Sequence, residues 1–318
     1  MNEFDLIARY FAPLATAPGA FGLKDDAAAI PPRPGFDLIV TTDQIAQGTD
    51  FFKHDPPDTI AKKALRVNLS DLAAKGARPF GYLLNLTLPD ADDAWLKGFA
   101  GGLANDQERF EISLLGGDTG RGALAIGVTA FGYVRQDQMV RRSTAKSGDA
   151  IYVSGTIGDS SAGLELLRKT TAAIPVGDRN FLIDAYRLPK PPVRFGWSLS
   201  YFANASVDVS DGLIADLGHL ASASGIQIEI DAEAIPRSEA LRAFLGNEPD
   251  AILRAATAGD DYQIAFAADP AREPQIHAEA ASAGIVVTRV GTAKPGEGVR
   301  ILFRGAVLNV PQPGYRHF

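Results

Sequence analysis

The chain has 318 residues, enough for about two domains, and its 46% apolar and 22% charged residues are typical of a globular protein. Its net charge is −7, from 31 basic and 38 acidic residues, which argues against nucleic acid and anionic membrane surfaces as partners. It contains no cysteine, so disulfides, thiolate metal sites and cysteine nucleophiles are excluded. No apolar segment reaches the length of a membrane span. We therefore expect no signal peptide, no membrane anchor and a cytoplasmic location.

Strands and helices alternate in the first half of the chain. Residues 37–43 form a short apolar, β-branched run, which predicts a buried strand. Residues 57–77 are predicted to form a helix, since they open with Pro57 and Asp58, repeat apolar residues at helical spacing and stop at Gly76. Further strands are expected at 80–89, 112–118 and 122–134, and a further helix at 92–110.

The alternation continues more loosely in the second half. Residues 148–155 are predicted to form a strand, and 158–169 a helix that Asp159 or Ser160 caps. Residues 205–225 predict a short strand that runs into a helix. The remaining strands are expected at 226–231, 262–267, 285–291 and 299–305.

A polar, basic stretch at 135–149 separates the two halves. It predicts two domains, 1–138 and 139–318. Because both halves alternate strands and helices, we expect an α/β (α+β) fold with mixed sheets.

Aspartates recur where predicted strands end and loops begin. The positions are Asp25, Asp26, Asp43, Asp118, Asp208 and Asp211, with Asp260 and Asp261 just before a strand and Asp71 on a helix. A single such aspartate is ordinarily a helix cap or a turn former. Many of them together indicate a cation site, because clustered carboxylates repel one another and ligands bind outside the carboxyl ends of strands.

The donor set suggests which cation this is. With only oxygen ligands and four scattered histidines, Mg²⁺ or Ca²⁺ is favoured over zinc. Mg²⁺ held by carboxylates and phosphate oxygens is usual at nucleotide sites, yet the chain has neither a Walker A loop nor a GxGxxG fingerprint. The segment "LLGGDTGRG" at 114–122 is expected to form a tight turn that presents Asp118 and lets backbone approach a phosphate.

Several motifs resemble, in order, those of the thiamine-monophosphate kinases, over nearly the whole chain. They are "LKDDAA" (23–28), "TTDQIAQGTDFF" (41–52), "KALRVNLSDLAAKGARP" (63–79), "LLGGDTGRG" (114–122), "VSGTIGDSSAGL" (153–164), "VDVSDGLIADLGHLASASG" (207–225), "AGDDYQIAF" (258–266) and "GYRHF" (314–318). The segment "NLSDLAAKGA" alone indicates only the wider aminoimidazole-ribonucleotide-synthetase (PurM-like) superfamily.

The resemblance implies a PurM-like two-domain fold. The N-terminal mixed sheets pair across a homodimer, and a C-terminal α+β domain completes the active site. The implied reaction transfers the γ-phosphoryl group of ATP directly to thiamine monophosphate, with several Mg²⁺ ions and without a catalytic acid or base.

The resemblance also implies roles for individual residues. Metal ligands would be Asp26, Thr41, Thr42, Asp43, Asp71, Asp118, Asp208 and Asp211. ATP contacts would be Gly117, Asp118, Arg142 and Ser210. Substrate contacts would be Asp50, Asp260 and Tyr315.

The chain departs from the family pattern on the acceptor side. The family usually has His where this chain has Asp50, Glu where it has Asp260, and a threonine where it has Gly120. Two alternatives therefore stay open. The same ATP and Mg²⁺ site acts on another acceptor, a small phosphorylated metabolite or an amide as in aminoimidazole-ribonucleotide synthetase, or the chain is a degenerate nucleotide-binding protein without activity.

Overall fold

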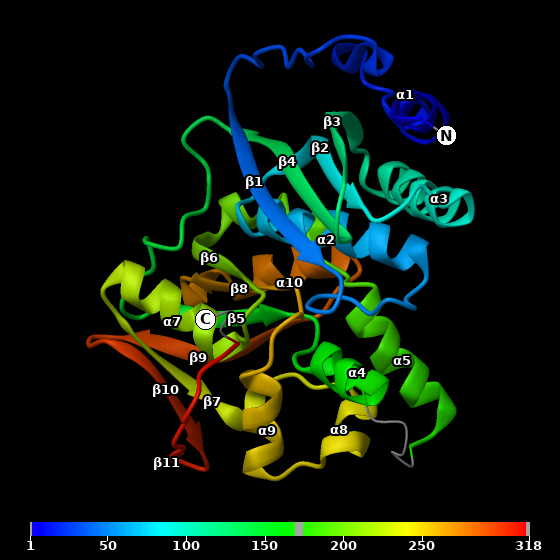
Figure 1. Cartoon of the computed structure of the whole chain (residues 1–318). Coiled ribbons are helices and arrows are strands. Elements are labelled where there is room, and N and C mark those ends of the chain that lie inside the picture. The colour runs from blue at the N-terminus through cyan, green and yellow to red at the C-terminus, as the bar shows by residue number, and fades with distance from the viewer. Residues whose placement is uncertain (1, 169–173, 316–318) are drawn as a thin grey trace. The chain divides into compact units, whose positions relative to one another are not determined.

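The computed structural model describes residues 2–168 and 174–315, which fold into two compact units (Figure 1). The first unit comprises Met1–Leu72 and Ala77–Gln138, and the second comprises Ala73–Gly76 and Met139–Phe318. The sequence placed residues 73–76 in the first domain. In the structure the Lys75 carbonyl accepts a 3.3 Å bond from the Val140 amide, and the Ala74 carbonyl accepts one from the Ser206 hydroxyl. These bonds assign the segment to the second unit.

The first unit contains a four-stranded mixed sheet with the strand order β1-β4-β2-β3. The strands are β1 (Phe36–Ala46), β2 (Arg78–Leu88), β3 (Ser113–Arg121) and β4 (Ala125–Arg135). β4 runs antiparallel to β1 and β2, whereas β2 and β3 are parallel. The parallel pair requires a crossover, which the helix between these two strands supplies.

The helices of the first unit are α1 (Glu3–Leu6), a π-helical turn (Ile7–Phe11), 3₁₀ turns (Ala12–Leu14 and Pro18–Leu23), α2 (Pro57–Ala74) and α3 (Asp93–Phe110). α3 begins where the Asp92 carboxylate accepts a 2.7 Å bond from the Trp95 amide, and it ends at Glu111 in the left-handed conformation. The Arg66 guanidinium of α2 forms two bonds, of 2.6 and 2.8 Å, with the Asp106 carboxylate of α3. This buried ion pair joins the two long helices.

The two faces of the first sheet differ. On one face Thr41 and Asp43 hydrogen-bond with residues of α2. Side chains alternate along a strand, so Leu38 and Val40 lie on the opposite face, where they are 42% and 54% exposed. The sheet therefore has one face against helices and one open face that carries apolar side chains.

The second unit contains a seven-stranded mixed sheet with the order β11-β10-β7-β9-β5-β8-β6. Its strands are β5 (Ala150–Ser154), β6 (Ala203–Val209), β7 (Gln227–Asp231), β8 (Gln263–Ala268), β9 (Val287–Lys294), β10 (Gly298–Phe303) and β11 (Ala306–Val307). Most neighbours are antiparallel, and β10 and β7 are parallel.

Helices of the second unit pack into two apolar cores. They are α4 (Asp159–Arg168), α5 (Val176–Arg187), α6 (Val193–Gly196), α7 (Leu213–Ser224), α8 (Glu239–Leu245), α9 (Pro249–Ala256) and α10 (Glu273–Ser282), with 3₁₀ turns at Leu199–Tyr201, Ala232–Ala234 and Pro270–Arg272. Leu213, Leu217 and Leu220 of α7 are fully buried in the core that includes β5 and β8. Leu182 of α5 and Leu241 of α8 belong to a smaller core with α4.

The structure confirms the predicted strands and the helices at 57–77, 92–110, 158–169 and 205–225, with ends shifted by a few residues and with Lys169 outside the described residues. The helices α5, α8, α9 and α10 were not predicted. They have 7 to 12 residues, a length at which helices depend on tertiary packing for their stability. No helix within residues 2–168 and 174–315 is long and apolar enough to cross a membrane.

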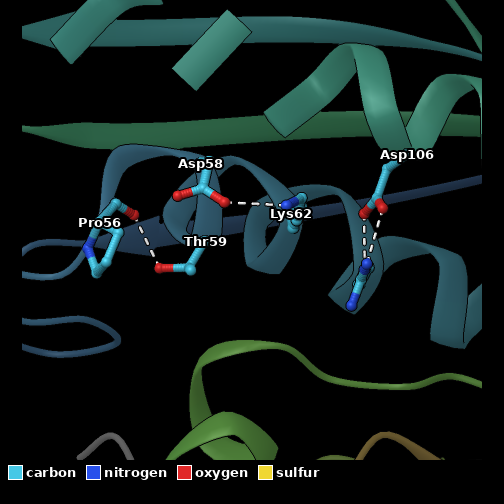
Figure 2. Close-up of polar contacts among 6 residues, drawn as sticks. Pro56, Asp58, Thr59, Lys62 and Asp106 are labelled. Carbon is cyan, nitrogen blue, oxygen red and sulfur yellow. Dashed lines mark hydrogen bonds and ion pairs between the residues drawn. The ribbon is translucent and has the colours of Figure 1, made fainter. Parts of the chain in front are cut away.

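The Arg66–Asp106 pair gives a prediction for stability. Figure 2 shows Asp106 with its two bonds beside the partly exposed Asp58–Lys62 pair of α2. Both side chains of the first pair are at most 6% exposed. Asp106→Asn should therefore lower the free energy of unfolding by about 3–5 kcal/mol, because it removes the negative charge that the buried Arg66 guanidinium contacts at 2.6 and 2.8 Å. Urea denaturation measures the change.

Asp58→Asn is the matched control. It removes a carboxylate that is 43% exposed and pairs with Lys62 at 2.9 Å. The expected loss is below about 1 kcal/mol. Equal losses in the two variants would contradict the prediction.

Candidate functional site

One group of acidic side chains lies between β1 and α2. The Thr41 hydroxyl donates a 2.5 Å bond to the Asp71 carboxylate, and the Asp43 amide donates a 3.0 Å bond to the Asn68 side chain. Loss of solvation, followed by the negative charge of Asp71, raises the pKa of the Asp43 carboxyl to about 6, although part of the residue remains exposed. A bound cation would relieve this repulsion. We call Thr41, Asp43 and Asp71 the β1 group.

Thr42 lies on the other face of β1. Its hydroxyl is 3.0 Å from the hydroxyl of Thr129 and donates a 3.1 Å bond to the Val128 carbonyl. Thr42 and Asp43 both line a cavity of about 330 Å³ together with Asn85. Neighbouring residues of a strand point to opposite faces, so the Thr41 and Thr42 hydroxyls are directed to different sides of the sheet.

A second cavity, of about 240 Å³, brings together Asp26, Gly117 and Asp118, and we call these the β3 group. Ile7 and Phe11 supply part of its apolar lining. Gly117 has a φ of 152°, and a Cβ atom there would lie 1.8 Å from the Leu84 carbonyl oxygen. Only glycine fits this position.

The prediction of a tight turn at 114–122 was wrong. The segment continues as β3, and its parallel pairing with β2 runs from Leu83 opposite Gly116 to Leu88 opposite Arg121. The glycines serve close strand packing instead, because Gly117 lies directly against Leu84. Asp118 is thus presented by an edge strand and not by a loop tip.

The sheet register separates the β1 and β3 groups. Asp43 pairs with Val128, Val128 pairs with Leu84, and Leu84 pairs with Gly117. Three strand spacings amount to about 14 Å. Because Mg²⁺ lies about 2.1 Å from its ligands, one ion cannot contact both groups, and the pattern requires several ions or a ligand that extends across the sheet.

In the second unit a loop between β6 and α7 is organised by Asp216. Its carboxylate accepts bonds of 3.0, 3.0 and 3.1 Å from the amides of Ser210, Asp211 and Gly212. Burial, followed by the charge of Asp211, raises the pKa of Asp216 to about 7. The sequence analysis did not single out Asp216. The available signal was an aspartate one helical turn after "SDG", where it can bond to the free amides of a helix start.

Four of the predicted residues meet at this loop. The Asp260 amide donates a 2.8 Å bond to the Ser210 carbonyl, and the Tyr315 amide donates a 2.9 Å bond to the Asp211 carbonyl. Asp260 has a φ of 71°, and its carboxylate accepts a 2.9 Å bond from the Tyr262 hydroxyl. The structure therefore brings Ser210, Asp211, Asp260 and Tyr315 together.

Two further predicted residues lie along β6. Asp208 pairs with Ile264 of β8. The Ser206 amide donates a 3.2 Å bond to the Arg141 carbonyl, which fixes Arg142 beside the strand. Because Ser206 and Asp208 are two residues apart, about 7 Å separates their backbones.

Asp50 stabilises its own turn. Its carboxylate accepts a 2.7 Å bond from the Ala46 amide at the end of β1, and its carbonyl accepts a 2.9 Å bond from the Lys63 ammonium group. Its charge also contributes to the raised pKa of Asp43. Asp50 therefore lies near the β1 group and is held in place by the backbone.

Asp261, next to Asp260, is buried and supports a different loop. Its two carboxylate oxygens accept bonds of 3.0 and 2.8 Å from the Gly158 amide at the start of α4. Burial raises the pKa of Asp261 well above its ordinary value, and the charge of Asp159 adds to the shift. Asp159 accepts hydroxyl bonds from Thr156 and Ser238, at 2.6 and 2.5 Å.

Comparison with known proteins identifies the family. The chain matches the AIR synthase related protein, N-terminal domain, over residues 24–134 and the corresponding C-terminal domain over residues 146–304. It therefore belongs to the AIR synthase-related proteins, a class with a two-domain PurM-like α/β fold and two mixed sheets.

Within this class the chain belongs to the thiamine-monophosphate kinases. It is 40% identical to the thiamine-monophosphate kinase of Caulobacter vibrioides, over 99% of this chain and 91% of the relative. The crystal structure of the Stenotrophomonas maltophilia enzyme has a TM-score of 0.83 and 41% identity, covering 88% of this chain and 89% of that one. AaThiL complexed with AMPPCP and TMP has a TM-score of 0.79 and 32% identity, covering 94% of this chain and 97% of that one.

Asp261 gives a prediction for pH dependence. Folding raises the pKa of its carboxyl above the ordinary 3.8, so the folded protein holds this proton more tightly than the unfolded chain does. The resulting stabilisation is complete below the unfolded pKa and is lost as pH rises through the folded pKa. An asparagine stays neutral throughout. The unfolding free energy of Asp261→Asn, relative to the unmodified protein, should therefore increase as pH rises from about 5 to 8.

Urea denaturation across this pH range measures the difference. Ser160→Ala, in the same loop, is the control, because it removes a buried hydroxyl that does not titrate in this range. Its difference from the unmodified protein should not change with pH. A difference for Asp261→Asn that is equally flat would contradict the prediction.

Proposed function

We propose that this chain transfers the γ-phosphoryl group of ATP to the phosphate of thiamine monophosphate, with Mg²⁺ as cofactor, and so forms thiamine diphosphate. The observation that carries the proposal is the similarity to AaThiL, which was obtained with AMPPCP, an ATP analogue, and TMP together. The similarity extends over both units, and the acidic groups described above lie within the matched residues.

The β1 and β3 groups and the Asp208–Asp211 loop would hold the metal ions. Their donors are carboxylate and hydroxyl oxygens, which Mg²⁺ prefers, and burial together with the neighbouring charge of Asp71 raises the pKa of Asp43 to about 6. When bound, Mg²⁺ neutralises phosphate charge and orients the reacting groups for in-line transfer.

The nucleotide-side residues have separate tasks. Gly117 lines the same cavity as Asp118, and its lack of a side chain lets β3 pack closely enough against Leu84 to place Asp118 there. The apolar wall of Ile7 and Phe11 in the same cavity suits the base or ribose. Arg142 supplies positive charge beside β6, and Ser210 is fixed by the Asp216 carboxylate.

The reaction needs no general base. The acceptor is a phosphate whose second pKa is about 6, so its attacking oxygen is largely ionised near neutral pH. Two polyanions must then be brought together, and phosphoryl transfer depends on positioning and charge neutralisation. The described carboxylates suit that purpose, because cations bound to them would neutralise the phosphate charge.

Asp50, Asp260 and Tyr315 are proposed as acceptor contacts. Tyr315 and Asp211 share a cavity of about 610 Å³, which is large enough for a small heterocyclic ligand. Asp260 is held beside Ser210 by its backbone, so its carboxylate lies at the same loop. At position 50 the family usually has a histidine, which is positive when protonated. Asp50 carries a negative charge at the same position.

We also propose a homodimer formed through the open face of the first sheet. Leu38 and Val40 are exposed on that face, and each is a large apolar side chain that water disfavours. If the open faces of two protomers packed together, Leu38 and Val40 would be buried in the interface.

Asp43→Asn tests the metal-dependent mechanism. It should lower kcat for thiamine diphosphate formation about 100-fold, because it removes charge from the β1 group, and it should weaken Mg²⁺-dependent nucleotide binding. Chromatographic detection of thiamine diphosphate and calorimetry with Mg²⁺ and AMPPCP measure the two effects. Asp58→Asn, on the exposed side of α2, is the control. Full activity of Asp43→Asn would rule out the proposed metal role.

Val40→Lys tests the dimer. A charge on the open sheet face should shift the protein from dimer to monomer in sedimentation velocity, because a buried lysine at a paired face has no counter-ion. Val286→Lys, at a valine that is 70% exposed in the second unit, is the control. A dimer that is equally stable in both variants would place the interface elsewhere.

A further inference from the structure

The cavity that Asp211 and Tyr315 share also contains His219, and no role has been given to this residue above. Its volume is about 610 Å³, and it lies wholly within the second unit. Ile214, Val299, Ile301, Val310 and Pro313 give it an apolar wall. We call it the α7 cavity, because α7 supplies both Ile214 and His219.

His219 faces the polar end of the α7 cavity. It is one helical turn after Asp216 on α7, whereas Asp211 lies in the loop just before the helix. A ring nitrogen of His219 and carboxylate oxygens of Asp211 and Asp216 all lie within 4.8 Å of one another. His219 itself is exposed, and so its imidazole is accessible to a ligand in the cavity.

The lining of the α7 cavity leaves few donors for an anionic or hydrogen-bond-accepting ligand. Among its described lining residues there is no lysine or arginine. The Asp211 carboxylate only accepts, and its backbone amide is already bonded to Asp216. Among the described lining residues the side-chain donors are the Tyr315 hydroxyl and the His219 imidazole, and of the two only His219 offers an N–H group.

Thiamine monophosphate, the acceptor in the proposed function, matches the apolar wall and the polar end of this cavity. It joins a phosphate to flat heterocycles, so its rings fit an apolar wall while its phosphate must lie toward the cation-binding end, where Asp211 is. An imidazole at the junction can donate to the phosphate or to a ring nitrogen. The nucleotide, by contrast, has its own apolar cavity in the first unit, lined by Ile7 and Phe11.

We propose that His219 is a specificity-determining residue that contacts the phosphorylated heterocyclic acceptor, and not the nucleotide, in the α7 cavity. This inference rests on the proposed function. It gives His219 the role of an N–H donor to the acceptor, next to Asp211, the carboxylate that the proposed function assigns to a metal ion.

The test compares His219→Leu with His219→Gln. Leucine fills a similar space without a donor, whereas glutamine restores an N–H group. His219→Leu should raise KM for thiamine monophosphate about tenfold, the equivalent of one lost hydrogen bond, and leave KM for ATP unchanged. His219→Gln should recover most of the loss. His277→Leu is the control, since His277 is a 52% exposed histidine on α10.

Calorimetric titration of thiamine monophosphate without ATP gives a second measurement that does not depend on turnover. His219→Leu should bind it about tenfold more weakly, with an unchanged melting temperature. Unchanged binding by a stable leucine variant, or an equal loss of ATP binding, would overturn the inference.

The two proposals can fail separately. If the unmodified protein binds thiamine monophosphate but forms no thiamine diphosphate, the proposed function fails, while the binding difference between leucine and glutamine still decides the role of His219. If the unmodified protein is active and the leucine variant matches it, only the inference about His219 fails.

Discussion

The mutual repulsion of closely placed carboxylates is the constraint on which this molecule depends. Burial and then the charge of Asp71 raise the pKa of Asp43 to about 6, and burial and then the charge of Asp211 raise the pKa of Asp216 to about 7. Such arrangements persist because rigid elements hold them: β1 and α2 in one case, and three backbone amides in the other. The folded scaffold thus keeps negative charge together in advance of any ligand, and a cation gains affinity from the repulsion that it removes.

The second unit separates two uses of carboxylates. Asp216 and Asp261 are buried and accept backbone amides, so they fix loops. Asp208, Asp211 and Asp260 stand at the same loops but are less buried. The buried acids fix the backbone, and their less buried neighbours are the ones that the proposed function assigns to ligands. Aspartates of this unit therefore differ in physical role, some fixing loops and others lying at the loop surface. Composition alone does not distinguish the two. The six residues are Asp159, Asp208, Asp211, Asp216, Asp260 and Asp261.

Much of this could be predicted from the sequence, and the failures have physical causes. Long periodic elements such as α2 and α3, and apolar strands such as β5, follow from pattern alone. The segment around Asp118 was wrongly expected to turn, because glycines there accommodate a neighbouring strand, which only the tertiary fold reveals. Asp216 was missed although its partners are local, because the residue pattern alone shows neither the conformation of the loop nor the burial of the carboxylate. The fully buried Asp261 could not be separated from Asp260, because burial is decided by distant residues such as Gly158.

β1 carries Thr41 and Asp43, and within the described residues it pairs along its length with β4 alone. The paired residues, such as Asp43 and Val128, are separated by some 85 positions of chain. Such distant pairing is slow to form, because the entropy of closing the long loop is lost before the strand contacts can stabilise it. During synthesis, residues 36–46 must therefore wait for β4 to leave the ribosome, and until then the acidic group has no defined geometry. The arrangement of Thr41, Asp43 and Asp71 is thus a property of the completed first unit and not of its separate segments.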